Sequence, residues 1–103
     1  LMPIEATLDL HGHSQESGFQ ALTHFVQAHQ AAGRRCVLVI TGKGLKEDWS
    51  VGVLREALPQ WLQHQSINKL ILAFSYAQPH HGGSGAVYLL LRRNRQSRPP
   101  GDA

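Results

Sequence analysis

The sequence predicts an α/β domain whose elements follow the order β-α-β-α-β-β. Three features of the chain support this: polar and apolar residues alternate over 6–11, the run 36–40 is apolar throughout, and apolar residues recur at helical spacing after each of these segments. Because a helix follows each of the first two strands, these strands are expected to be parallel and joined by a right-handed connection.

The first strand is expected over residues 6–11, with Leu8 and Leu10 on its core face. Ser14 is a suitable N-cap for the first helix, and Gly33 is a suitable C-cap. Gly18 within this helix is expected to weaken it slightly.

The run CVLVI, residues 36–40, is apolar on both faces, which is typical of a central strand. Residues 41–50 are predicted as turn and loop, and a second helix is predicted over 51–62. Pro59 is expected to break or kink this helix near Ala57 or Leu58, because proline has no N–H to donate. Segments 70–74 and 86–92 are predicted as the third and fourth strands, with a loop between them.

Size and composition fit one compact domain, since 103 residues with 42% hydrophobic content bury roughly 60–65% of the unfolded surface. No apolar run approaches the roughly 18–20 residues that cross a bilayer, and no signal peptide is evident, so a cytoplasmic protein without membrane contacts is expected.

The net charge of +3 favours an acidic partner. Cys36, the single cysteine, excludes an internal disulfide and a multi-cysteine zinc site, and is predicted to be a small core residue.

The chain is expected to divide into a flexible N-terminal linker (1–5), the domain itself (6–93) and a disordered basic tail (94–103). The arginines near the C-terminus leave a second interpretation open, an electrostatic arm that contacts nucleic acid. Oligomeric state and a fused or separate partner domain stay open.

Three polar segments that contain glycine lie between the predicted elements: LDLHGHS, TGKG and HHGGSGA. The first two follow strands, and in open α/β sheets ligands bind at the carboxyl ends of strands. If the first two strands are adjacent and parallel, Asp9 and His11 will lie beside Lys43. The third segment is expected to reach the same edge.

These segments, together with VLREALPQWL and VYLLLRR, resemble the Smr (small MutS-related) domain family over about residues 8–92. The resemblance implies an α/β two-layer sandwich, a four-stranded mixed sheet with two helices on one face, similar to the C-terminal domain of a bacterial translation initiation factor. It also implies a nuclease that nicks DNA or cleaves RNA, including mRNA on stalled ribosomes. The functional residues that it implies are Asp9, His11, Thr41, Gly42, Lys43 and Gly44.

Asp9 and His11 are two positions apart on the predicted strand and are therefore expected to project from the same face. A carboxylate placed there can orient an imidazole that acts as a general acid or base. The alternative is a structural pair in which the acid holds a histidine at a strand end. His13 has no place in the family pattern.

TGKG lacks the longer glycine spacing and the hydroxyl residue that a P-loop requires, so nucleotide hydrolysis is not expected. Its glycines let backbone amides approach a phosphate, and Lys43 adds a positive charge. The other candidates for phosphate contact are Arg55, His81, Gly82, Gly83 and Gly85. Solvated turns and a solvated helix face are the alternatives for these residues.

No cofactor is required by this pattern. Asp9 and His11 suit a divalent ion such as Mg²⁺ or Mn²⁺, but Glu47 and Asp48 are the only carboxylates available to complete a two-metal centre. A divalent ion at Asp9 and His11 is therefore possible but is not required by the sequence pattern. The histidines in helical contexts are predicted to be surface residues: His24, His29 and His64.

The sequence leaves two hypotheses open for the function of the domain. The first is an endonuclease: in RNA, His11 or another histidine would deprotonate a 2′-hydroxyl that attacks the neighbouring phosphate, while Lys43 stabilises the developing charge. DNA lacks this nucleophile, so water must attack and a metal ion becomes a natural helper.

The second is a nucleic-acid-binding module without catalysis, which recruits a partner such as the ribosome. Its phosphate contacts would be Lys43, Arg55 and the terminal arginines. Trp49 and Tyr76 are the aromatic residues expected in loops, so no base-stacking platform is evident.

Overall fold

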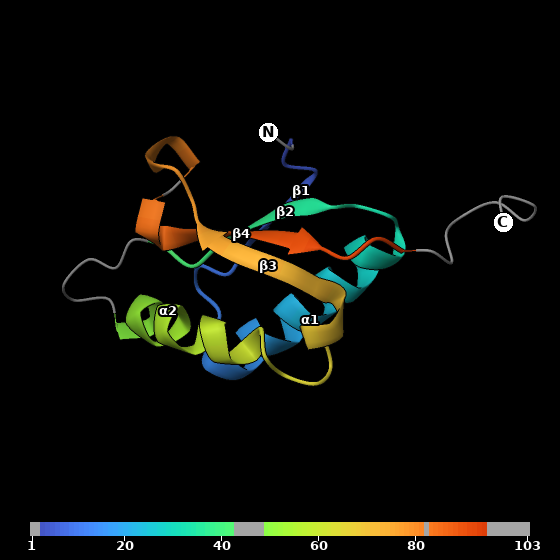
Figure 1. Cartoon of the computed structure of the whole chain (residues 1–103). Helices are drawn as coiled ribbons and strands as arrows, with labels where there is room; N and C mark the ends of the chain where they lie inside the picture. Colours follow the sequence, from blue (N-terminus) through green and yellow to red (C-terminus); the bar gives the residue numbers. More distant parts are fainter. Residues whose placement is uncertain (1–2, 43–48, 82, 95–103) are drawn as a thin grey trace, which may run out of the picture.

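The computed structural model describes residues 3–42, 49–81 and 83–94, and the predicted order of strands and helices is confirmed there. The main elements are β1 (Ala6–Asp9), α1 (Gln15–Ala31), β2 (Cys36–Ile40), α2 (Trp49–Trp61), β3 (Ile71–Tyr76) and β4 (Ala86–Leu91). The strands form one mixed sheet in the order β1-β2-β4-β3, in which β1 and β2 are parallel and the other neighbours antiparallel. Both helices cover the same side of this sheet (Figure 1), so the predicted two-layer sandwich is confirmed.

The two helices cover one face of the sheet, and we call the face without helices the open face. Val39 of β2 and Leu89 of β4 are fully buried on the helix-covered face, against residues of α1 and α2 such as Leu22 and Leu54. Leu38 belongs to a smaller cluster on the open face. Because β2 lies between β1 and β4 and is covered on both faces, the prediction of a central strand is confirmed.

Local hydrogen bonds explain where α1 begins. The Ser14 side chain accepts the N–H of Ser17, and the Ser17 side chain accepts the N–H of Ser14, which satisfies two amides that the helix itself leaves unpaired. The helix ends at Ala31, and the N–H of Gly33 donates to the carbonyl of Gln30. The first helix is therefore confirmed.

The predicted start of α2 is wrong, and a break at Pro59 does not occur. The helix begins at Trp49, a residue predicted to lie in a loop, and it continues through Pro59 to Trp61. The kink, which was the other prediction for Pro59, stays a prediction. Proline removes one hydrogen bond of the helix, but the N–H of Leu62 donates to the carbonyl of Leu58 and resumes the pattern. Burial of Leu58 and Trp61 in the core offsets the missing bond.

The strand β3 begins and ends later than predicted. It starts at Ile71 after a short 3₁₀ turn, and it extends to Tyr76, which had been expected in a loop. Ser75 and Tyr76 pair with Tyr88 and Val87 of β4, so cross-strand hydrogen bonding outweighs their local preference for a turn. β4 ends at Leu91, one residue earlier than predicted.

Gly18 permits a close approach of the two helices. A Cβ atom at this position would lie 3.1 Å from Cδ2 of Leu54 and 3.2 Å from Cη2 of Trp61, both on α2. The predicted cost of a glycine inside α1 is therefore compensated by the packing of α1 on α2.

Replacing Gly18 with valine is expected to lower the free energy of unfolding by about 1–3 kcal/mol, because two core side chains must move. The matched control is Gly52→Ala on α2, where no atom lies within 4 Å of the new Cβ. This variant should gain about 0.5–1 kcal/mol from helix propensity. Urea unfolding measures both changes, and a Gly18→Val protein as stable as the wild type would contradict the packing argument.

The first described residues are tied to the sheet, and the last described residue is tied to the end of α1. The N–H groups of Arg35 and Cys36 donate to the carboxylate of Glu5 at 2.6 and 3.2 Å, and they hold the pKa of Glu5 below its ordinary value. Asn94 donates a side-chain hydrogen bond to the carbonyl of Ala31 at 2.7 Å. The boundaries of the linker and the tail stay predictions, since residues 1–2 and 95–103 lie outside the described ranges.

Candidate functional site

Three of the segments singled out in the sequence meet at one end of the sheet. The N–H of Leu10 donates to the carbonyl of Ile40 at 2.7 Å, which joins the end of β1 to the end of β2. The N–H groups of Thr41 and Gly42 donate to the carbonyl of Gly85 at 2.9 and 3.0 Å, which joins the end of β2 to the start of β4. The structure therefore brings the first motif, the described part of the second and the glycine end of the third together.

A tight turn follows β1 and presents His11. The N–H of His13 donates to the carbonyl of Leu10 at 3.0 Å, and Gly12 at the third position of the turn has φ +86°. No described residue other than glycine has positive φ, so this is the arrangement of a type II turn, which requires glycine at that position. The His11 side chain is exposed at the second position of the turn.

The prediction that Asp9 and His11 share one face of a strand is wrong. β1 ends at Asp9, and the turn at Gly12 interrupts the alternation of side chains before His11. Asp9 instead accepts the main-chain N–H of His11 on its Oδ1 at 2.8 Å. The carboxylate therefore fixes the backbone of the turn that carries the imidazole.

His13, which had no place in the motif, belongs to the start of α1. Its Nδ1 lies 3.1 Å from the Oγ of Ser17, and the ring is half-buried. Ser17 also accepts a hydrogen bond from the Ser14 hydroxyl at 3.0 Å. His13 thus supports the capping of the helix that follows the turn.

Thr41 joins the second motif to the third. It is 2% exposed, and its hydroxyl donates to the carbonyl of Gly85 at 3.3 Å. Because its N–H and that of Gly42 also bond to Gly85, these groups hold β2 and β4 together. Their contact with phosphate stays a prediction, and Lys43 and Gly44 lie outside the described residues.

The histidines of the third motif lie against the open face. Nδ1 of His81 lies 2.6 Å from the hydroxyl of Tyr88, and the rings of His80 and His81 are 4.1 Å apart between centroids. The N–H groups of His81 and Gly83 both donate to the carbonyl of Gln78, which shapes this loop. Gly82 lies outside the described residues.

A cavity of about 630 Å³ lies between this loop and the first described residues. Its lining is Pro3, Ile4, Cys36, Gln78, His80, His81 and Tyr88. Cys36 was predicted in the core, but it is half-buried at this cavity, where burial raises the pKa of its thiol. Tyr88 was not identified from the sequence because nothing in an apolar strand pattern shows that its hydroxyl meets a histidine seven residues away.

The sheet register places Asp9 on the same face as this cavity. Asp9 is paired with Ile40 of β2, and Tyr88 of β4 is paired with Leu38, so both side chains project from the open face. They lie two strands apart, which corresponds to about 10 Å across the sheet. Arg55 is on α2 and therefore belongs to the other face, where it lines a hollow with Tyr76, Gly52, Glu56 and Pro59.

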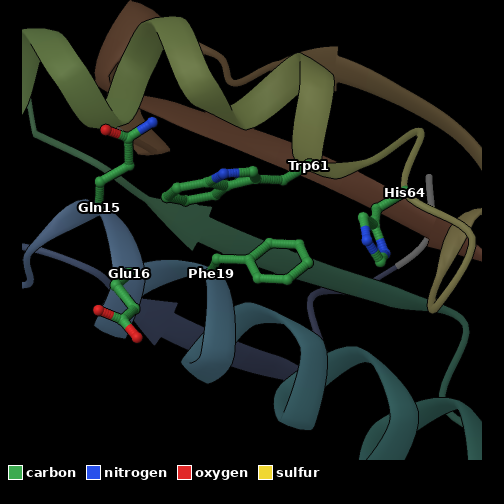
Figure 2. Close-up of a pocket in the computed structure, with 5 residues that line it drawn as sticks. All are labelled: Gln15, Glu16, Phe19, Trp61 and His64. Atoms are coloured by element: carbon green, nitrogen blue, oxygen red, sulfur yellow. The ribbon is translucent and has the colours of Figure 1, made fainter.

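The outer surface between the helices is aromatic. Figure 2 shows Phe19 of α1 beside Trp61 of α2 and His64, with Gln15 and Glu16 nearby. The Phe19 ring lies 5.8 Å from Trp61 and 4.9 Å from His64 between centroids. His24 and His64 are exposed, as predicted, whereas His29 is half-buried with its ring 4.4 Å from Phe25, so its prediction as a surface residue is wrong.

Within the described ranges, no group of three or more His, Cys, Asp or Glu residues is placed to hold a metal ion. Asp9 uses one carboxylate oxygen for the turn amide, and Glu47 and Asp48 lie outside these ranges. The described residues thus do not form a two-metal centre. None of the described helices is long and apolar enough to cross a membrane.

Known proteins resemble this chain in sequence and in structure. Probable DNA endonuclease SmrA of Escherichia coli is 34% identical over 96 residues, which cover 93% of this chain and 50% of SmrA. Ribosome rescue factor SmrB of Tolumonas auensis is 31% identical over 88 residues, which cover 84% of this chain and 45% of SmrB. The chain therefore spans about half the length of these two relatives.

The fold is shared with YdaL, a stand-alone small MutS-related protein from Escherichia coli, whose crystal structure superposes with a TM-score of 0.74 at 35% identity. The superposition covers 88% of this chain and 67% of YdaL. Residues 8–92 match the Smr domain, which includes the turn after β1, the junction of β2 with β4 and the whole sheet from Leu8 onward. The chain belongs to the Smr domain family.

Proposed function

We propose that this chain is an endonuclease domain that cleaves nucleic acid by acid–base chemistry at the turn after β1. The observation that carries the proposal is the meeting of this turn with the Thr41–Gly42 segment and Gly85 at one end of the sheet. The exposed imidazole of His11 on this fixed turn supports the proposal, because an imidazole can move protons at a bound phosphodiester. The name of the relative SmrA, a probable DNA endonuclease, supports a nuclease.

In the proposed reaction, His11 takes the proton from the attacking hydroxyl, and Asp9 acts as a positioning residue through the N–H of His11. RNA supplies the nucleophile itself, since its 2′-hydroxyl lies next to the scissile phosphate. The new bond forms between this oxygen and phosphorus and gives a 2′,3′-cyclic phosphate. The bond from phosphorus to the 5′-oxygen of the next nucleotide breaks, and that oxygen takes a proton from solvent water. Lys43 is the candidate to stabilise the negative charge that develops on the phosphate.

We propose that RNA is the preferred substrate, because this route needs no more than imidazole and a cation. Cleavage of DNA requires an attacking water, which a divalent ion such as Mg²⁺ or Mn²⁺ would activate. Asp9 and His11 are the residues that would contribute to holding such an ion. The name of the relative SmrB, a ribosome rescue factor, supports RNA on the ribosome as one substrate to test.

The test is a cleavage assay on labelled RNA and DNA strands of the same sequence, each with and without a chelator. We expect the RNA strand to be cut in the presence of the chelator. If DNA alone is cut, and only without chelator, water attack assisted by a metal replaces the proposed route. If neither strand is cut while both are bound, the domain is a binding module without catalysis.

A further inference from the structure

Exposed apolar side chains are concentrated along β3, the edge strand of the sheet. The large hydrophobic residues exposed in the described ranges are Val53 on α2 and Leu72, Phe74 and Tyr76 on β3. Phe74 is 43% exposed and Tyr76 is 58% exposed. Two large rings exposed on one short strand cost free energy in water, which indicates a surface that binds something flat and apolar.

Both rings project from the same face of the strand. Phe74 is paired with Leu89 and Tyr76 with Val87 of β4, and residues directly opposite each other on antiparallel strands point to the same side. Leu89 and Val87 point to the helix-covered face, so the two rings lie at the outer rim of that face. Their Cα atoms are separated by two residues of a strand, or about 6.7 Å.

Positive charge lies at the start of this strand, and charges of both signs lie at its other end. Lys69 in the turn before β3 is exposed, and Arg92 and Arg93 are exposed after β4, where the N–H of Arg92 donates to the carbonyl of Leu70. At the other end, Arg55 lines the hollow that contains Tyr76, together with the acidic residue Glu56. Aromatic rings beside a group of cations are the arrangement that binds single-stranded nucleic acid without sequence preference, because every base has an apolar face.

We propose that Phe74 and Tyr76 form a stacking platform for unpaired bases, so that the substrate of this domain is single-stranded nucleic acid. This inference rests on the proposed nuclease function and names its substrate class. Asp9 and the end of β3 lie at the same end of the sheet. Asp9 is paired with Ile40, which is paired with Ala86. The N–H of Ala77, just after β3, donates to the carbonyl of Ala86. Three strand spacings separate them, about 14 Å across the sheet. Because Asp9 projects from the open face and both rings from the helix-covered face, the single strand would pass around this end of the sheet, along the turn that carries His11.

Charge argues against a second copy of this chain as the occupant. A parallel pairing of two β3 edges would place Lys69, Arg92 and Arg93 of one copy beside the same residues of the other. An antiparallel pairing would place them beside Arg55 and Glu56, whose opposite charges offset each other and supply no net attraction. Phosphate groups, by contrast, are attracted to the cationic start of β3. The net charge of +3 favours the same partner.

The test measures the affinity of the full chain for labelled oligonucleotides by fluorescence anisotropy. Phe74→Ala and Tyr76→Ala should each weaken binding to single-stranded RNA and DNA by about tenfold, and binding to a duplex of the same sequence should not change. Tyr76→Phe keeps the ring and should bind as the wild type does. The matched control is Leu72→Ala, which removes an aliphatic side chain, 48% exposed, from the same strand and should leave affinity unchanged.

Three results would overturn the platform. The first is an equal loss of affinity for single strand and duplex, the second is a loss in Leu72→Ala as large as in the ring variants, and the third is no loss of affinity in the ring variants. A change in the sedimentation of the free protein in Tyr76→Ala, with unchanged affinity for nucleic acid, would assign β3 to a second copy instead. These results are separable from the nuclease proposal, because that proposal is tested by cleavage and none of these affinity measurements decides it. Circular dichroism of each variant confirms that it is folded.

Discussion

His11→Ala is expected to lower the rate of phosphodiester cleavage by about 100-fold or more, which is the usual contribution of a general acid or base. The imidazole is exposed on a turn fixed by the Leu10–His13 hydrogen bond, so its removal should leave the fold intact. The affinity for substrate should also stay unchanged, because no phosphate contact is assigned to this ring. Single-turnover cleavage, measured with enzyme in excess, separates the chemical step from binding.

The control for this experiment is His24→Ala, which removes an exposed imidazole from α1 on the helix-covered side of the molecule. Cleavage by this variant should match that of the wild type. Cleavage by His11→Ala at the wild-type rate would remove His11 from the reaction.

The fold could be predicted from the sequence wherever one local signal determined each element. The cap at Ser14 and the apolar run over 36–40 were sufficient to identify α1 and β2, because capping and burial act within a few residues. The boundaries of α2 and β3 could not be predicted in the same way. Pro59 remains helical and Tyr76 extended because of packing and pairing with distant residues, and these outweigh the local preferences.

The residues of the site were easier to identify than their roles. The strand alternation predicted that Asp9 and His11 project from the same face, but the turn at Gly12, with its positive φ, interrupts the strand, and Asp9 bonds to the main-chain N–H of His11 instead. Thr41 has a polar side chain in a glycine motif, and only the sheet pairing shows that it is buried against Gly85. The proposed aromatic platform was missed because Tyr76 was expected in a loop, and only the pairing of β3 with β4 shows that its ring shares a face with that of Phe74.

Asp9→Ala is expected to lower the cleavage rate by about 100-fold, because misplacement of a catalytic group by about 1 Å has an effect of that size. The alanine variant loses the acceptor for the N–H of His11, which then lacks the 2.8 Å bond that fixes the turn. Asp9→Asn keeps a carbonyl oxygen in the same place and removes only the charge, so it should retain most of the activity. A positioning role predicts that kcat falls in Asp9→Ala while KM stays unchanged.

The comparison of the two Asp9 variants decides what the carboxylate does. If Asp9→Asn is as inactive as Asp9→Ala, the negative charge is required, either to stabilise the protonated imidazole or to hold a divalent ion. These two roles respond differently to metal: added Mn²⁺ should restore cleavage only where a metal site has been weakened. If Asp9→Asn cleaves as the wild type does and Asp9→Ala does not, the aspartate acts through the backbone of the turn, as its hydrogen bond to His11 indicates.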